Sequence, residues 1–340
     1  MTDIKKYNKL IVVIIVSCMI NFGLSGIITV SSSASYIQCI LSCLFALFVY
    51  CVIYNKHINN FLMSKTAYVK FISVVTVFIL IIYSAGFIGN TCELINKFFM
   101  KKTPSYYLCA FLIFPCCFGA FYGLCTMSRY SVIVWLMLIL SVCFMAVFCF
   151  DEYSIYNIFP VFGMDKSNLI LNSFDFSIYG VILIFYYCLF GCNNKINDSK
   201  KNIIKIILFS GIISTVICFM INLILPYQAV VHVDNPLLTL ASFINVNFLL
   251  ERSEIIVLII LLSLCFITVG SFFASVCVIA EKTIGISDRK GIAFCLFFAC
   301  YLLSVVLSKY NISVYALEFS KYGVFVISVL IPFIAYIRGE

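Results

Sequence analysis

Asp175 is the residue whose position points most directly to function, because it stands where an apolar segment begins. It lies in the stretch 168–177, which leads into the apolar run 178–190. An ionisable side chain inside a bilayer costs roughly 2.5 to 3.5 kcal/mol, and such residues usually face a cavity or a partner. If the span begins near Ser177, Asp175 is a helix N-cap at the membrane surface. If it begins near Asn168, the acid lies on the order of 12 Å deep.

A second polar interruption occurs early in the chain, in the stretch 21–26. There Asn21, Gly23, Ser25 and Gly26 disturb an otherwise apolar segment. A matching pair of interruptions favours the deeper placement of Asp175, where its carboxylate recognises an ammonium group or couples to a cation. Taken alone, the two glycines are explained by close helix packing, because small residues let transmembrane helices approach.

Residues for hydrolytic or metal chemistry are missing. His57 and His232 are the only histidines, and the predicted topology puts them on opposite sides of the membrane. There is no Walker loop, no GxGxxG and no CxxC. The 18 cysteines lie mostly within apolar stretches, where a free cysteine packs as a small hydrophobe. We therefore expect no enzyme activity, no metal and no cofactor.

The elements that position these residues are membrane helices. The chain is 64% hydrophobic and 11% charged, against about 25% charged residues in soluble domains. At about 20 residues per crossing, we predict an all-α polytopic protein with one domain over residues 1–340. Its ten predicted spans are 9–30, 35–55, 70–95, 106–127, 130–150, 168–191, 202–225, 252–280, 290–309 and 319–337.

The distribution of basic residues predicts the orientation, because cytoplasmic loops are enriched in Lys and Arg. With both termini in the cytoplasm, only seven of the 22 basic residues fall outside: Lys97, Lys101, Lys102, Lys166, Arg252, Lys309 and Lys321. The cluster of three lysines at 97–102 goes against the rule, but the total supports it. The net charge of +8 is thus a topology signal, and we expect no nucleic-acid partner.

The two interruptions fall in predicted spans one and six, five spans apart. Many secondary transporters consist of two inverted five-helix repeats, in which the first helix of each repeat is broken around the substrate. Unwound backbone is tolerated at that depth where it lines a cavity. We therefore predict two inverted five-helix repeats with helices 1 and 6 broken. The predicted ligand-binding residues are Gly23, Ser25, Gly26, Tyr83, Ser173, Asp175, Ser177 and Ser271.

Two outer segments also carry predictions. The segment 157–163, Asn-Ile-Phe-Pro-Val-Phe-Gly, is expected to be extended and to end in a turn. Pro236 is expected in the first turn of a short helix, capped by Asp234 or Asn235. That helix would lie over the outer mouth as a lid.

Several segments, in order, resemble the B subunit of GerA-type spore germinant receptors, relatives of the amino acid, polyamine and organocation transporters. The resemblance covers nearly the whole chain, although each motif is short. The segments are Glu93 to Pro104, Tyr122 to Arg129, Asn157-Ile-Phe-Pro-Val-Phe, Asn235-Pro-Leu-Leu-Thr-Leu and Leu250-Glu-Arg-Ser-Glu254.

The resemblance implies a germinant-sensing subunit in the spore inner membrane, embedded in the lipid bilayer. It implies an A subunit and a lipoprotein C subunit as partners. A small germinant such as an amino acid would bind between spans one, three, six and eight. The alternative is a secondary amino-acid transporter of the same fold. A membrane glycan or lipid transferase or polymerase fits less well, because the catalytic acid or histidine cluster it needs is largely missing.

Overall fold

The fold is all-helical over the part of the chain that the computed structural model describes, residues 2–23, 32–53, 67–161, 176–182, 185, 199–226, 229, 235–242, 254–283, 285 and 288–338. The helices are α1 (Thr2–Cys18), α3 (Ser35–Ile53), α5 (Ala67–Phe98), α6 (Ser105–Phe148), α9 (Ser199–Ile224), α11 (Pro236–Ser242), α12 (Glu254–Thr283), α13 (Arg289–Lys309) and α14 (Ser313–Arg338). Short non-α turns are the π-helical η1 (Met19–Gly23) and the 3-10 helices η2 (Ser32–Ala34), η3 (Phe150–Glu152), η4 (Ile155–Ile158) and η5 (Phe176–Gly180).

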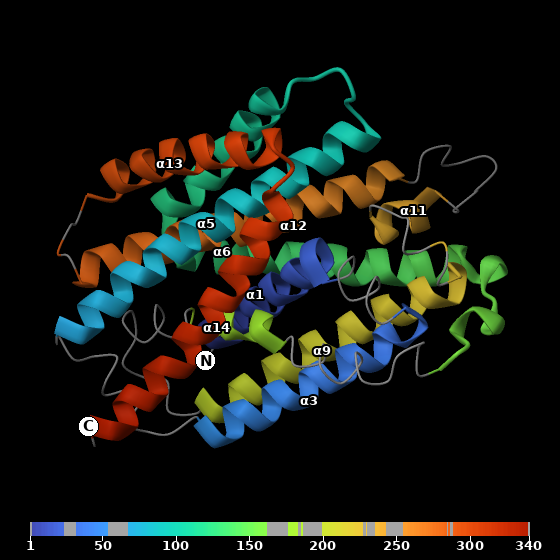
Figure 1. The fold of residues 1–340 in the computed structure, drawn as a ribbon, viewed down its shortest axis with the longest axis horizontal. Helices are drawn as coiled ribbons and strands as arrows, with labels where there is room; N and C mark the ends of the chain where they lie inside the picture. The colour runs from blue at the N-terminus through green and yellow to red at the C-terminus, as the bar shows by residue number, and fades with distance from the viewer. Residues whose placement is uncertain are drawn as a thin grey trace.

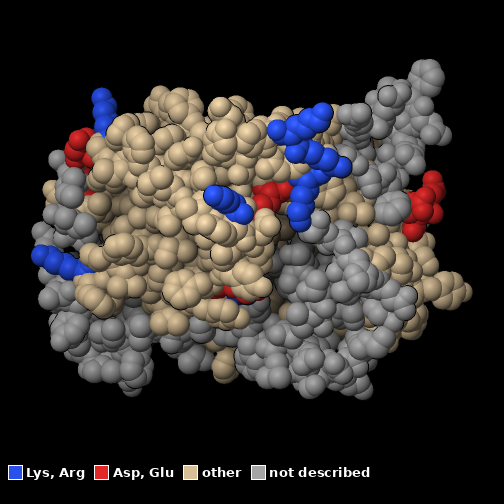
Figure 2. Space-filling view, turned by 45° about the horizontal axis from the view of Figure 1, so that its top comes forward, with Lys and Arg blue, Asp and Glu red and all other residues tan. Residues whose placement is uncertain are grey.

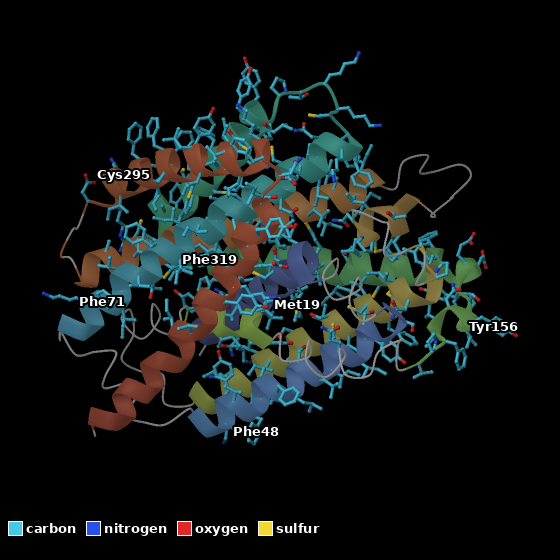
Figure 3. All side chains as sticks on the ribbon, viewed as in Figure 1. Met19, Phe48, Phe71, Tyr156, Cys295 and Phe319 are labelled. Carbon is cyan, nitrogen blue, oxygen red and sulfur yellow. The ribbon has the colours of Figure 1, made fainter. Side chains whose placement is uncertain are left out.

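Five helices within the described ranges are long and apolar enough to cross a membrane. They are the segments Lys70–Phe98, Ser105–Phe148, Lys201–Ile224, Ile255–Glu281 and Arg289–Lys309. Large apolar side chains also point outward, as Phe48 and Phe71 do in Figure 3, whereas Met19 is buried in the middle of the molecule. An apolar exterior suits a protein surrounded by lipid, so the protein is a polytopic membrane protein.

Helix α6 contains two of the predicted spans. A straight helix of its 44 residues would be about 66 Å long, twice the roughly 30 Å of a bilayer core. Gly123 interrupts it with φ 76° and ψ 177°, a conformation open to glycine because it has no Cβ. The two halves run in opposite directions in Figure 1. The predicted boundary at residues 128–129 was therefore wrong by about five residues, because the turn requires the glycine.

Helix α1 lies in the middle of the molecule and packs against α6, α9 and α12. In Figure 1, α3 and α9 run together along the lower edge and α5 and α13 along the upper edge. Helix α14 crosses in front and packs against α5 and η5. The helix ends predicted to be cytoplasmic, at Ala67, Thr283 and Arg289, lie at the left of this view. The alternating direction of successive helices agrees with a chain that crosses a membrane repeatedly.

Helices α6 and α12 approach each other closely at two glycines. A Cβ on Gly119 would lie 2.4 Å from the carbonyl oxygen of Gly270 and 2.6 Å from its Cα. A Cβ on Gly270 would instead meet the side-chain Cε of Met127, at 2.2 Å. Small residues permit such backbone contact between membrane helices. This contact fixes the position of α12, which carries several of the candidate site residues.

Three distant segments are tied together at the C-terminal end of α9. The Asn222 side chain donates to the Ser33 carbonyl at 2.8 Å and contacts the Ser35 hydroxyl. The Asn157 side chain donates to the last α9 carbonyls, at 3.1 and 3.2 Å. The Ser33 hydroxyl donates to the Pro160 carbonyl. The predicted extended segment does not begin at Asn157, because η4 turns here so that the amide reaches the open carbonyls of the helix end; Phe159 has extended angles, and residues 162–163 lie outside the described residues.

The short helix expected at Pro236 is confirmed as α11. The Asn235 side chain accepts from the backbone N–H groups of Leu237 and Leu238, at 3.1 and 3.2 Å. Asn235 is therefore the N-cap. The other proposed cap, Asp234, lies outside the described residues. Most of α11 is buried against α12 and α9.

Candidate functional site

The candidate site is built around Tyr83, a fully buried tyrosine on α5. Its hydroxyl is a polar neighbour of the Cys18 thiol at the end of α1. Its ring packs edge-to-face on Phe272 of α12, with centroids 5.1 Å apart. Phe272 in turn meets Phe185, at 5.9 Å. Tyr83 therefore joins the end of α1, the middle of α12 and the segment that follows η5.

Polar contacts hold η1 and the end of α1 in place. The Thr268 hydroxyl of α12 donates to the Ser17 hydroxyl at 2.8 Å. The Asn90 side chain of α5 donates to the Asn21 carbonyl of η1 at 2.9 Å. In a π-helix the hydrogen bond reaches one residue further than in an α-helix, and such turns are frequent at functional sites. The last turn of α1 is thus bonded to α12, and the irregular turn η1 that follows it is bonded to α5.

Ser271 has an unusual environment. Its side chain is fully buried, and its hydroxyl oxygen has no hydrogen-bond partner within the described part of the chain. Leaving a buried hydroxyl unsatisfied costs about 1 to 3 kcal/mol. Ser271 lies beside Phe272 on α12, three residues after Thr268. The hydroxyl is consequently free to bond a molecule that enters between α12 and its neighbours.

The predicted ligand-binding residues fall into three groups. Tyr83 and Ser271 lie buried on α5 and α12, two helices that pack together. Gly23 ends η1, and Ser177 lies within η5. The other four lie outside the described residues: Ser25, Gly26, Ser173 and Asp175. The depth of Asp175 therefore stays a prediction.

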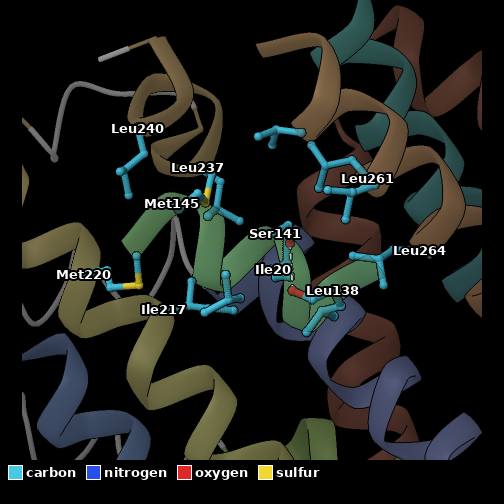
Figure 4. Close-up of a pocket in the computed structure, with 13 residues that line it drawn as sticks. Ile20, Leu138, Ser141, Met145, Ile217, Met220, Leu237, Leu240, Leu261 and Leu264 are labelled. Atoms are coloured by element: carbon cyan, nitrogen blue, oxygen red, sulfur yellow. Dashed lines mark hydrogen bonds between the residues drawn. The ribbon is translucent and has the colours of Figure 1, made fainter. Parts of the chain in front are cut away.

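A cavity of about 40 Å³ lies next to η1, and the sequence reasoning missed it (Figure 4). Its lining residues come from η1, the second half of α6, α9, α11 and α12: Ile20, Leu138, Ser141, Val142, Met145, Ile217, Met220, Leu237, Leu240, Val257, Ile260, Leu261 and Leu264. The Ser141 hydroxyl already donates to the Leu138 carbonyl, at 2.8 Å. With no free polar group, the cavity does not suit a charged ligand. Apolar residues at helical spacing look like ordinary core, so no sequence signal marks it.

Two pairs of thiols touch across helices. The Sγ atoms of Cys39 and Cys218 are 3.4 Å apart, and those of Cys92 and Cys109 are 3.5 Å apart. No group of three or more His, Cys, Asp or Glu side chains suited to a metal occurs in the described part of the chain. The buried thiols join helices as small apolar side chains do.

The described geometry shows to which class of protein the chain belongs. Long apolar helices, a chain reversal at Gly123 and buried hydroxyls between α1, α5 and α12 belong to a polytopic helical membrane protein. The particular family follows from comparison with known proteins. The family model described as spore germination protein, the spore permeases, matches residues 7–313, so the chain belongs to this family. The family is one of permeases, membrane proteins of the transporter or receptor type. A search of curated proteins found no match.

Proposed function

We propose that the protein is the membrane subunit of a GerA-type germinant receptor and binds a small nutrient, an amino acid, between predicted spans one, three, six and eight. The packing of Tyr83 and Phe185 on Phe272, together with the buried Ser271 hydroxyl that has no partner among the described residues of the same bundle, carries this proposal. Membership of the spore germination family supports the role in germination.

The proposed architecture is ten helices in two inverted five-helix repeats. Two observations support it. Predicted span one leaves α-helical geometry at η1, and predicted span six contains the 3-10 helix η5. Both irregular segments fall where the sequence predicted broken helices, five spans apart.

The ligand would act by binding one receptor state more tightly than the other, since equal affinity for both shifts nothing. An amino acid offers a carboxylate for backbone N–H groups at the break and an ammonium group for carbonyls or for Asp175. The carboxylate or the ammonium group of the ligand could also form a hydrogen bond with the Ser271 hydroxyl. This bond would remove the free-energy cost of a buried hydroxyl without a partner. The active state would then release ions and start germination.

The remaining parts of the proposal concern the setting. The subunit would lie in the spore inner membrane with both termini in the cytoplasm. It would assemble with an A subunit and a lipoprotein C subunit. Co-expression with these subunits and purification through a tag on this chain tests the assembly; failure to recover either partner contradicts it.

Binding of a panel of small amino acids to the purified protein in nanodiscs tests the ligand site. We expect Ser271→Ala to weaken binding about tenfold, the value of one hydrogen bond of about 1.4 kcal/mol. Ser263→Ala is the matched control, because this hydroxyl is on the same helix and bonds only within it, to the Ile259 carbonyl at 2.9 Å. Unchanged affinity in Ser271→Ala removes that serine from the site, and unchanged affinity in Asp175→Ala removes the acid.

Uptake measurements separate sensing from transport. The receptor proposal expects binding without accumulation of the amino acid in proteoliposomes. Accumulation that depends on an ion gradient would instead make the protein a secondary amino-acid transporter of the same fold.

A further inference from the structure

The lysine cluster that violates the charge rule lies on a rigid turn between α5 and α6. Lys97 lies in the last turn of α5, and Lys101 and Lys102 are exposed on the connecting residues 99–104. The turn is closed by backbone bonds from Phe99 and Met100 to the Ile95 carbonyl and from Thr103 to the Met100 carbonyl. The Asn96 amide, in its corrected orientation, donates to the Thr103 and Met100 carbonyls at 2.9 and 3.1 Å. The lysines are therefore presented by an ordered backbone.

A fourth lysine belongs to the same end of the bundle. Lys309 is the last residue of α13, which packs against both α5 and α6, and its ammonium lies 5.9 Å from the Tyr310 ring centroid. We call Lys97, Lys101, Lys102 and Lys309 the basic rim. Figure 2 shows lysine and arginine side chains gathered on one part of the surface, with acidic atoms beside them.

The acids near the basic rim do not neutralise it. Glu93 is half-buried, accepts a hydrogen bond from the Ser313 hydroxyl at 2.6 Å, and interacts electrostatically with Lys97. Glu318 lies on the second turn of α14. Lys101 and Lys102 form no ion pair with any residue in the described ranges. At least these two charges are available to an anion from outside the chain.

An aromatic stripe starts directly below the basic rim. Tyr107, Phe111, Phe114 and Phe118 follow one another on α6 at spacings of four, three and four residues, so they share one helix face. Each is 41 to 72% exposed. Over its 11-residue length the stripe extends about 16 Å at 1.5 Å per residue. This is close to half of the roughly 30 Å hydrocarbon core, the length of one leaflet.

We propose that the basic rim and the aromatic stripe together bind an anionic phospholipid. Lys101 and Lys102 hold the headgroup phosphate, and an acyl chain lies along Tyr107 to Phe118. The stripe favours a lipid over an acidic protein, because a protein partner would not need an apolar track of leaflet length. The exposed Tyr106 hydroxyl, next to the turn, suits the interface between headgroups and hydrocarbon, where tyrosine is enriched.

The experiment is lipid retention by the whole protein. The protein is reconstituted in nanodiscs with equal phosphatidylglycerol and phosphatidylcholine, transferred to mild detergent, and examined by native mass spectrometry. We expect retained phosphatidylglycerol to exceed phosphatidylcholine. The double variant Lys101→Gln/Lys102→Gln should lose this preference, by about fivefold for each lysine. Lys101→Arg/Lys102→Arg should keep it, because the charge remains.

Two further variants separate the parts of the site. Lys290→Gln removes an exposed lysine at the opposite end of α13 and should retain the preference. Phe111→Ala/Phe114→Ala should reduce retention of both lipids alike. Equal retention of the two lipids by the wild-type protein overturns the proposal. So does a preference that survives in the Gln variant.

Competitors identify the source of the anion. Glycerol phosphate in excess should leave the retained lipid in place, because it has no acyl chain; displacement would mean that a free phosphate is the ligand. A polyglutamate peptide that binds the wild type but not the Gln variant, and expels the lipid, would assign the surface to an acidic protein and overturn the lipid assignment.

Discussion

The contact between Gly119 and Gly270 yields a prediction in which two matched substitutions should behave differently. In Gly119→Ala, the new methyl group would lie 2.4 Å from a backbone oxygen and 2.6 Å from a backbone carbon of α12. Backbone cannot move out of the way alone, so α6 and α12 must separate. Overpacking of this kind costs about 1 to 3 kcal/mol, and the upper end applies here.

Gly270→Ala places the new methyl group at the same contact but on α12 instead of α6. The new methyl group meets the terminal Cε of Met127, and the nearest backbone atom is 3.5 Å away. A methionine end can rotate to another conformer, at about 0.5 to 1.5 kcal/mol if it stays strained. Both glycines lie inside helices, so the change in helix propensity is similar and cancels in the comparison.

Denaturant unfolding of the two purified variants in one detergent, followed by circular dichroism, measures the difference. We expect Gly119→Ala to lower the unfolding midpoint clearly and Gly270→Ala to stay close to the wild type. A Gly270→Ala variant that is as unstable as Gly119→Ala, or less stable, refutes the reasoning.

Three further predictions follow from single contacts. Gly123→Ala should destabilise the protein by about 1 to 3 kcal/mol, because φ 76° is strained for alanine, and denaturant unfolding measures it. Asn235→Ala should cost about 1 kcal/mol, and faster hydrogen exchange confined to α11 would show the loss of its cap. Thr268→Val should lower the free energy of unfolding by about 0.6 kcal/mol in the same assay, because it removes the hydrogen bond to Ser17. Thr268→Ser keeps that hydroxyl and should cost less. Equal losses in the two variants would contradict the role of the hydrogen bond.

Local chemistry was the most predictable part of this fold. A cap at Asp234 or Asn235 could be predicted from neighbouring residues alone, because the donor and acceptor groups are two to three positions apart, and the structure selects Asn235. Most helix ends fell within a few residues of their predicted positions for the same reason. The turn between the halves of α6 was misplaced, because Arg129 looked like a loop residue while the helix in fact continues past it.

Tertiary contacts explain what the sequence could not predict. Tyr83 and Ser271 were chosen as polar residues within apolar helices, and both are buried on neighbouring helices. Whether the Ser271 hydroxyl finds a hydrogen-bond partner depends on which side chains surround it. The spacing of residues along the sequence does not predict those neighbours. The cavity beside Ile20 arises where five segments leave a gap, so its lining carries no motif.

The hydrogen bonds at the C-terminal end of α9 couple the movements of three segments of the chain. Asn157, Asn222 and Ser33 belong to segments more than 60 residues apart. Asn157 bonds the end of α9, Asn222 of α9 bonds Ser33, and Ser33 bonds Pro160, three residues after Asn157. If α9 tilts, η4 and η2 must therefore move with it. Otherwise the hydrogen bonds that Asn157 and Asn222 donate to backbone carbonyls would break together. A partner that binds the loop after α6 would therefore also constrain the end of α9 and, through Asn222, the start of α3.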